Sequence, residues 1–142
     1  MQNKYEEADL LGRNIVMKIF PKIDMVETDI SARCDLSGTS LTGNWYMEVK
    51  YRGDLKSTSY DTDILEYEKL SALRNIDRNG TYFYFMIFSD GVARCYNLKD
   101  INIMDVYINN DLYPVSSSEN KGHKEKLMIE LPVNKAKVYK WN

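Results

Sequence analysis

The sequence predicts an α+β fold within the wider α/β class, in which a mixed central β-sheet is flanked by helices. Residues 25–34 and 44–52 alternate polar and apolar side chains with period two, as half-buried strands do. Residues 3–20 and 61–76 repeat apolar side chains every three or four positions, as amphipathic helices do. With 142 residues, 44% of them hydrophobic, the chain fits a single domain, residues 1–142.

The composition and net charge of the chain limit the kinds of partner that it can bind. The net charge of −2 at pH 7 argues against a wholly basic nucleic-acid coat, although lysines concentrate after residue 120, so any attraction to a polyanion is local. The sequence has neither a run of eighteen apolar residues nor a signal-peptide pattern, which predicts a cytoplasmic protein without membrane contact. Cys34 and Cys95 lack metal-type spacing and are expected to be reduced core residues.

The first predicted helix, residues 3–20, ends before Pro21. Its apolar stripe consists of Tyr5, Ala8, Leu11, Ile15 and Ile19. Glu6, Glu7 and Asp9 fall in its first turns, where acidic side chains favour the positive end of the helix dipole. This dipole effect explains the three acids without any functional role.

The two period-two stretches are predicted to form an antiparallel hairpin, because turn-forming residues fill 36–43 between them. With the turn centred near Gly38 and Thr39, Asp29 lies directly across from Glu48. Two facing carboxylates destabilise a sheet unless a cation lies between them. A shift of register by one or two residues would instead leave Asp29 as a solvated strand residue.

The remaining elements follow in order. A helix is predicted from about 61 to 76 because Asp61 or Thr62 can cap it and its apolar stripe follows, and the apolar run 82–88 fits a strand covered on both faces. The turn at 89–91 leads into a partner strand at 92–98. Residues 101–108 fit either a strand or a short helix, 114–121 a loop, and 126–131 a short strand. The closing residues, 133–142, combine Lys135, Lys137 and Lys140 with aromatic side chains, which is compatible either with nucleic-acid contact or with a solvated tail.

Several chemistries are missing from the sequence. His123 is the only histidine, which argues against a histidine-dependent triad and a multi-histidine zinc site. The phosphate-binding and nucleophile motifs rich in glycine are also lacking. What remains is a carboxylate and lysine site, in which carboxylates hold Mg²⁺ and a lysine orients or deprotonates the attacking water.

At this point the residues resemble a known family. A helix, a strand with Asp29, a strand with Glu48-Val49-Lys50, a second helix and the apolar strand follow one another as in the core of the PD-(D/E)XK, or restriction-endonuclease-like, nuclease superfamily. The resemblance covers roughly residues 3–98. Its motif is short, and its placement on these elements makes it informative.

The resemblance implies a metal-dependent nuclease that hydrolyses DNA phosphodiester bonds, with Mg²⁺ or Mn²⁺ as cofactor. It implies that Asp29 and Glu48 bind the metal, that the carbonyl of Val49 adds a ligand, and that Lys50 positions the attacking water. Glu6 or Glu7 would match the acidic residue that many members carry on the first helix. The sequence departs from the pattern because Thr28, not proline, precedes Asp29.

Two neighbouring aspartates are weaker candidates than Asp29. Asp24 lies on the wrong face by parity, and Asp35 would fall past the end of the strand. The expected partner is DNA, with RNA as the alternative, and a homodimer is compatible with the sequence. Arg33, Arg52, Lys135, Lys137 and Lys140 are the expected nucleic-acid contacts, which requires the C-terminal segment to fold back beside the hairpin. The alternative function is a non-catalytic nucleic-acid-binding or assembly module, in which Glu48 and Lys50 form a surface ion pair.

Overall fold

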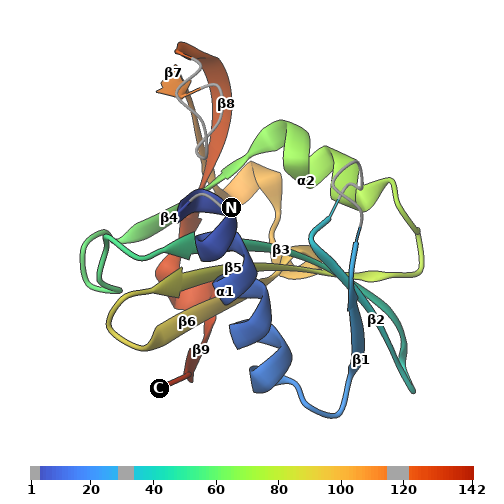
Figure 1. Cartoon of the computed structure of the whole chain (residues 1–142). Coiled ribbons are helices and arrows are strands. Elements are labelled where there is room, and N and C mark those ends of the chain that lie inside the picture. Colours follow the sequence, from blue (N-terminus) through green and yellow to red (C-terminus); the bar gives the residue numbers. More distant parts are fainter. Residues whose placement is uncertain (1–3, 29–33, 115–121) are drawn as a thin grey trace.

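A computed structural model describes residues 4–28, 34–114 and 122–142 of the chain (Figure 1). The helices and strands of these residues are, in chain order, α1 (Lys4–Ile19), β1 (Asp24–Glu27), β2 (Leu36–Ser40), β3 (Gly43–Arg52), β4 (Thr62–Glu66), α2 (Tyr67–Arg74), β5 (Thr81–Phe88), β6 (Val92–Asn97), β7 (Tyr107–Pro114), β8 (His123–Pro132) and β9 (Lys137–Lys140). Short 3₁₀ turns cover Leu98–Asp100, Ile103–Asp105 and Val133–Lys135. None of the described helices is long and apolar enough to cross a membrane.

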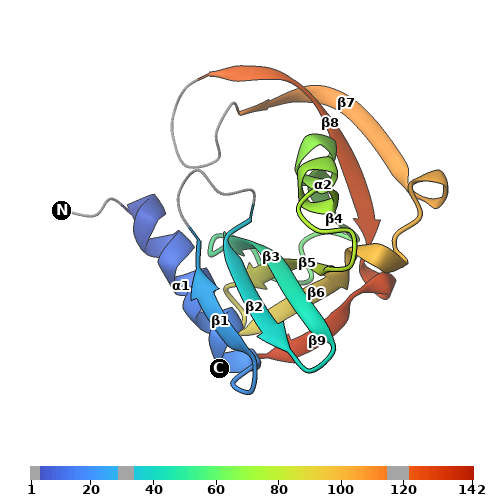
Figure 2. The same cartoon turned by 90° about the vertical axis from the view of Figure 1, so that its right-hand side faces the viewer.

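The strands form a large sheet in the order β1-β2-β3-β5-β6-β9 and a small sheet in the order β4-β8-β7. In the large sheet β3 pairs with β5 in parallel, and the other pairs are antiparallel, so the sheet is mixed as predicted. α1 covers one face, where Val16 packs with Met47 and Phe85. α2 and the small sheet cover the other face, where Leu73 packs with Tyr84 (Figure 2). This arrangement confirms the predicted fold class.

α1 meets the sheet at a position where it has no side chain. A Cβ on Gly12 would lie 3.1 Å from Val49 Cγ1 and 3.4 Å from Tyr51 Cβ, so glycine allows the helix backbone to approach β3 closely. Ile15 and Val16 are buried on the same side, whereas Leu11, which was assigned to the buried stripe, is 43% exposed. The helix is therefore rotated from the predicted face, and it ends at Ile19 as expected from Pro21.

The predicted hairpin register is wrong because its turn was misplaced. Residues 36–40, expected in the loop, form the separate strand β2, and the tight turn falls at Leu41 and Thr42. Leu36 pairs with Met47, so one residue further along this register it is Asp35 that lies across from Glu48. β1 pairs in turn with β2, with Glu27 opposite Leu36.

The predicted helix at 61–76 also needs correction, because its first part is a strand. β4 pairs with β8, and the helix begins only at Tyr67. The inward positions of β4 are Asp63 and Leu65, and the buried carboxylate of Asp63 binds Arg94 and Tyr96 at 2.6–2.7 Å. A polar residue at an inward position hides the period-two pattern by which a strand is recognised.

The predicted strand at 82–88 and its hairpin partner are confirmed as β5 and β6. The undecided segment 101–108 contains a 3₁₀ turn followed by the start of β7, and β8 is longer than the predicted 126–131. β7 and β8 form a hairpin that extends beyond the large sheet on the side of α2 (Figure 2). The C-terminal segment does not lie beside the first hairpin, because β9 pairs with β6 at the opposite edge of the large sheet.

Candidate active site on strand β3

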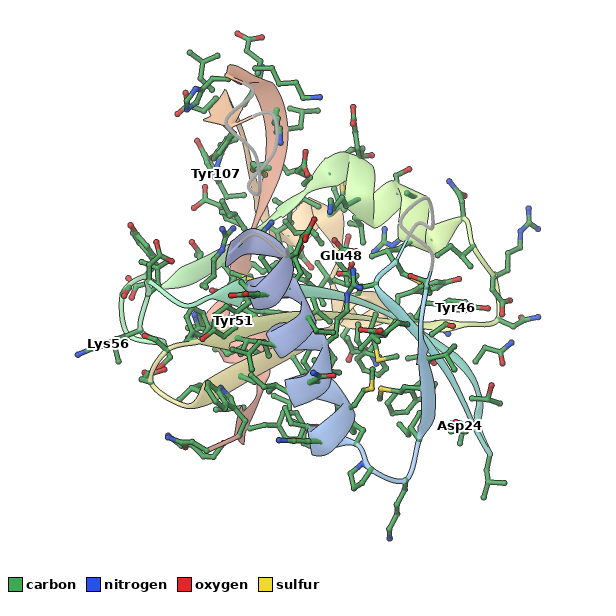
Figure 3. The ribbon with its side chains drawn as sticks, viewed as in Figure 1. Asp24, Tyr46, Glu48, Tyr51, Lys56 and Tyr107 are labelled. Atoms are coloured by element: carbon green, nitrogen blue, oxygen red, sulfur yellow. The ribbon has the colours of Figure 1, made fainter. Side chains whose placement is uncertain are left out.

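The candidate site lies where β2 and β3 separate. The pairing of β2 with β3 ends at Leu36 and Met47, while β3 continues beside β5 as far as Arg52. Glu48 therefore lies at the fork between the two strands, and Figure 3 places it between α1 and α2. Both helices can extend side chains to this point.

Glu48 is the most buried acid of the site, with 7% of the residue exposed. Burial raises the pKa of its carboxyl group above the usual range, and the nearby charge of Asp35 raises it further. Lys69 on α2 opposes this shift, with its Nζ 2.6 Å from Glu48 Oε1. The ion pair with Lys69 thus favours the charged form of Glu48, which burial and Asp35 disfavour.

Asp35 is fixed by contacts with two elements. Its backbone N–H donates to the carbonyl of Met47 at 2.9 Å, and its Oδ2 accepts from the N–H of Val49 at 2.8 Å. Arg13 on α1 donates to Oδ1 at 3.2 Å. These contacts hold Asp35 beside β3, next to Glu48. From the sequence, Asp35 was expected to lie past the end of the strand at 25–34 and away from the site. Asp29, the predicted partner of Glu48, lies outside the described residues, and its role stays a prediction.

Lys50 follows Glu48 on the same face of β3, as the alternation predicted. Its side chain is half-buried, and this burial is the main reason that its pKa is lowered. Repulsion from the positive charges of Arg52 and Lys69 lowers the pKa further. The acids Asp9 and Glu48 act in the opposite direction. A lysine held in this way deprotonates more readily than one in water.

Asp9 on α1 belongs to the same electrostatic cluster. Its pKa is raised mainly because neighbouring groups displace water from its carboxylate, even though the residue as a whole is exposed. The positive charge of Lys50 lowers this pKa, and the negative charge of Asp35 raises it. Glu6 and Glu7, the predicted acids of this helix, are exposed in its first turn. The sequence contained one signal for Asp9, since Arg13 stands one helical turn later on the same face.

Lys69 was missed by the sequence argument. An exposed helical lysine has no distinctive sequence signal, and the contact of Lys69 with Glu48 depends on how α2 packs against the sheet. Among the predicted nucleic-acid contacts, Arg52 is half-buried on β3, and Arg33 lies outside the described residues. Lys135, Lys137 and Lys140 lie on or beside β9, away from this site.

The donors at the fork suit a hard divalent cation. Asp35 and Glu48 offer carboxylate oxygens, and the carbonyl of Val49 is the predicted third ligand. Within residues 4–28, 34–114 and 122–142, no three Asp, Glu, His or Cys side chains group closely enough to hold a metal. Two carboxylates with water fit Mg²⁺, which retains several waters and needs few protein ligands. A cation here would also relieve the cost of charging buried Glu48.

The chain has the restriction-endonuclease-like fold. Its structure is similar to that of Hjc, a Holliday junction resolvase from the archaeal hyperthermophile Archaeoglobus fulgidus, with a TM-score of 0.52. The match covers 87% of this chain and 95% of Hjc, at 10% sequence identity. At that identity the likeness establishes the fold alone. No protein-family model and no curated protein matches the sequence.

Proposed function

We propose that the protein is a divalent-metal-dependent nuclease that hydrolyses DNA phosphodiester bonds. The observation that carries the proposal is the meeting of Asp35 with Glu48 and Lys50 where β2 leaves β3, close to Asp9 of α1. DNA is favoured over RNA because Hjc, on a similar fold, is by its name a Holliday junction resolvase. A homodimer remains part of the proposal and is tested by light scattering.

In the proposed reaction, Asp35, Glu48 and the carbonyl of Val49 would hold Mg²⁺ or Mn²⁺, and Glu6 or Glu7 remains the accessory acid expected from the sequence, with Asp9 better placed. Such a cation would supply Lewis-acid chemistry, namely a lowered pKa for a water molecule and stabilisation of negative charge on a phosphoryl oxygen. Lys50 orients this water through its Nζ, and its lowered pKa suits that atom to accept the proton that leaves the water. Arg52, two residues further on the same face of β3, attracts the phosphate backbone.

Changing Lys50 to alanine tests this reaction. Lys50→Ala should reduce Mn²⁺-dependent cleavage of plasmid DNA at least 100-fold, because general acid and base groups contribute about 10²–10⁴-fold. Circular dichroism and DNA affinity should remain near those of the wild type. Lys22→Ala, at an exposed residue in the turn after α1, is the matched control. A Lys50→Ala protein that cleaves at the wild-type rate would exclude this role.

A pair of variants decides between the two candidate aspartates. Asp35→Asn should abolish cleavage, whereas Asp29→Asn should retain it if Asp35 is the second acid of the site. The reverse result would restore the assignment made from the sequence.

A non-catalytic nucleic-acid-binding or assembly module is the second candidate. It is favoured by the basic partners that both acids already have, Lys69 for Glu48 and Arg13 for Asp35. Under this alternative the wild type binds DNA without cleaving it in Mg²⁺ or Mn²⁺, and Lys50→Ala changes nothing but a weak ion pair.

A further inference from the structure

The two acids of the site are held by basic side chains from opposite faces of the large sheet. Arg13 extends from α1, with its Nη2 3.2 Å from Asp35 Oδ1, and Lys69 extends from α2, with its Nζ 2.6 Å from Glu48 Oε1. Each cation contacts one oxygen of a carboxylate that is proposed to bind the metal. An ammonium or guanidinium group and a divalent cation repel each other when they share one carboxylate.

We propose that Arg13 and Lys69 are displaceable counter-ions, which hold the site closed to metal until nucleic acid arrives and then move to its phosphates. This inference rests on the proposed function, because it concerns metal and DNA binding at the same site. It adds a regulatory property, since metal and DNA then assist each other's binding.

The contacts of the two side chains support their release. The Lys69 side chain is 48% exposed although the Glu48 side chain that it contacts is only 10% exposed, so the ammonium approaches a buried oxygen from the solvent side. The Arg13 side chain is 26% exposed and also contacts Glu27 Oε1 at 3.9 Å. A long flexible side chain in such a position can exchange a carboxylate for a phosphate without moving the backbone.

The alternative arrangement would keep both ion pairs when metal binds. It is disfavoured by charge, because Lys50 and Arg52 already repel cations at this site, and Lys50 interacts unfavourably with both Arg52 and Lys69. A polyanion supplies the negative charge that allows two basic side chains and a metal ion to occupy one site. Reciprocity then requires that DNA raise metal affinity by the factor by which metal raises DNA affinity.

The test measures binding rather than cleavage. Isothermal titration with Mn²⁺ alone should give an affinity at least fivefold higher for Lys69→Met than for the wild type, because the competing cation is gone. Lys69→Arg, which keeps the charge, should bind Mn²⁺ no more tightly than the wild type. Lys22→Met serves as the matched control because Lys22 is an exposed lysine in the turn after α1. An affinity of Lys69→Met within twofold of the wild type, or below it, overturns the proposal.

A second measurement follows the coupling. The affinity for a short DNA duplex is measured by fluorescence anisotropy with and without Ca²⁺, another oxygen-preferring cation. Ca²⁺ should increase DNA affinity by at least tenfold in the wild type and by less than threefold in Lys69→Met. Equal factors in the two proteins contradict the proposed exchange.

If Lys69→Met fails to fold, Arg13→Met provides the same test. Arg13→Met leaves Asp35 without its basic partner, and Asp35 is less buried than Glu48, so this loss costs less stability. It should also tighten Mn²⁺ binding in the absence of DNA, and an unchanged affinity overturns the proposal. The two failures are distinguishable: a wild type that cleaves DNA beside variants of unchanged Mn²⁺ affinity refutes only the counter-ion role. Variants that bind Mn²⁺ more tightly, with no cleavage by any protein, refute only the nuclease.

Discussion

Glu48 keeps a carboxylate in an environment that disfavours its charge, and this has a measurable consequence. Mn²⁺ should raise the melting temperature of the wild type, because a ligand that binds only the folded state stabilises it. At ten times the dissociation constant the gain is about 1.4 kcal/mol, which corresponds to a shift of roughly 2–8 °C for a domain of this size. Differential scanning fluorimetry measures it.

Variants assign this shift to the proposed ligands. Asp35→Asn and Glu48→Gln should each remove it, and Asp24→Asn, at an exposed acid of β1, should keep it. Retention of the full shift in both site variants would place the metal elsewhere.

A second buried acid has a structural role. Asp63 accepts two hydrogen bonds from the Arg94 guanidinium and one from Tyr96, and Arg94 also donates to the carbonyl of Ser57 at 2.7 Å. Asp63→Ala should lower the free energy of unfolding by about 3–5 kcal/mol, because it leaves a buried charge without its partner. Urea denaturation measures this loss. Combining Asp63→Leu with Arg94→Met should recover much of it, and a double variant as unstable as the single one would contradict the explanation.

Sequence reasoning succeeded for residues whose position depends on local pattern alone. Glu48 and Lys50 follow from the period of one strand, and the strand is where it was expected. Asp35 depends on which residues form the turn, and the turn was placed about three residues too early. Asp9 and Lys69 depend on how two helices lie against the sheet, which only tertiary packing determines.

Among the elements, α1 owes its position to Gly12. Gly12→Leu should lower the free energy of unfolding by about 1–3 kcal/mol, because the added side chain would overlap Val49 and Tyr51 and force the helix away from β3. The same displacement would move Asp9 away from Lys50, so the variant should also cleave DNA more slowly. Asn14→Leu, which adds the same side chain at an exposed position of α1, is the control for urea denaturation and cleavage. Equal stability of the two variants would mean that the close approach is not required.

The elements that were predicted correctly are those with unmixed patterns. α1, β3, β5 and β6 have clear periods or continuous apolar runs. β4 was assigned to a helix because its inward Asp63 is polar, and β2 was assigned to a loop because Ser37, Gly38 and Thr39 are common in turns. Both strands are stabilised by pairing with other strands, and the sequence of a single segment does not show which strands will pair with it.

For the whole molecule, the distribution of positive charge determines how nucleic acid can lie. β9 is separated from β3 by β5 and β6, a distance of about 14 Å across neighbouring strands. Arg52→Gln should therefore reduce the slope of log affinity against log salt by about one, since it removes a phosphate contact beside the site. Neutralising Lys135, Lys137 and Lys140 together should reduce this slope by less per charge than Arg52→Gln does. Equal reductions per charge, measured by fluorescence anisotropy at several salt concentrations, would extend the bound surface to β9.

The connection from β3 to β5 carries β4, and this has a consequence for the order in which the chain folds during synthesis. β4 pairs with β8, so that Thr62 lies opposite Pro132 and Glu66 opposite Met128. The apolar face formed by Tyr84 and Leu65 therefore stays incompletely covered until β8 has left the ribosome, because Ile129 and Leu131 complete it. Pairings between distant parts of a sequence form slowly and leave partly folded chains open to aggregation. The nascent protein thus depends on β8 to cover β4 and β5.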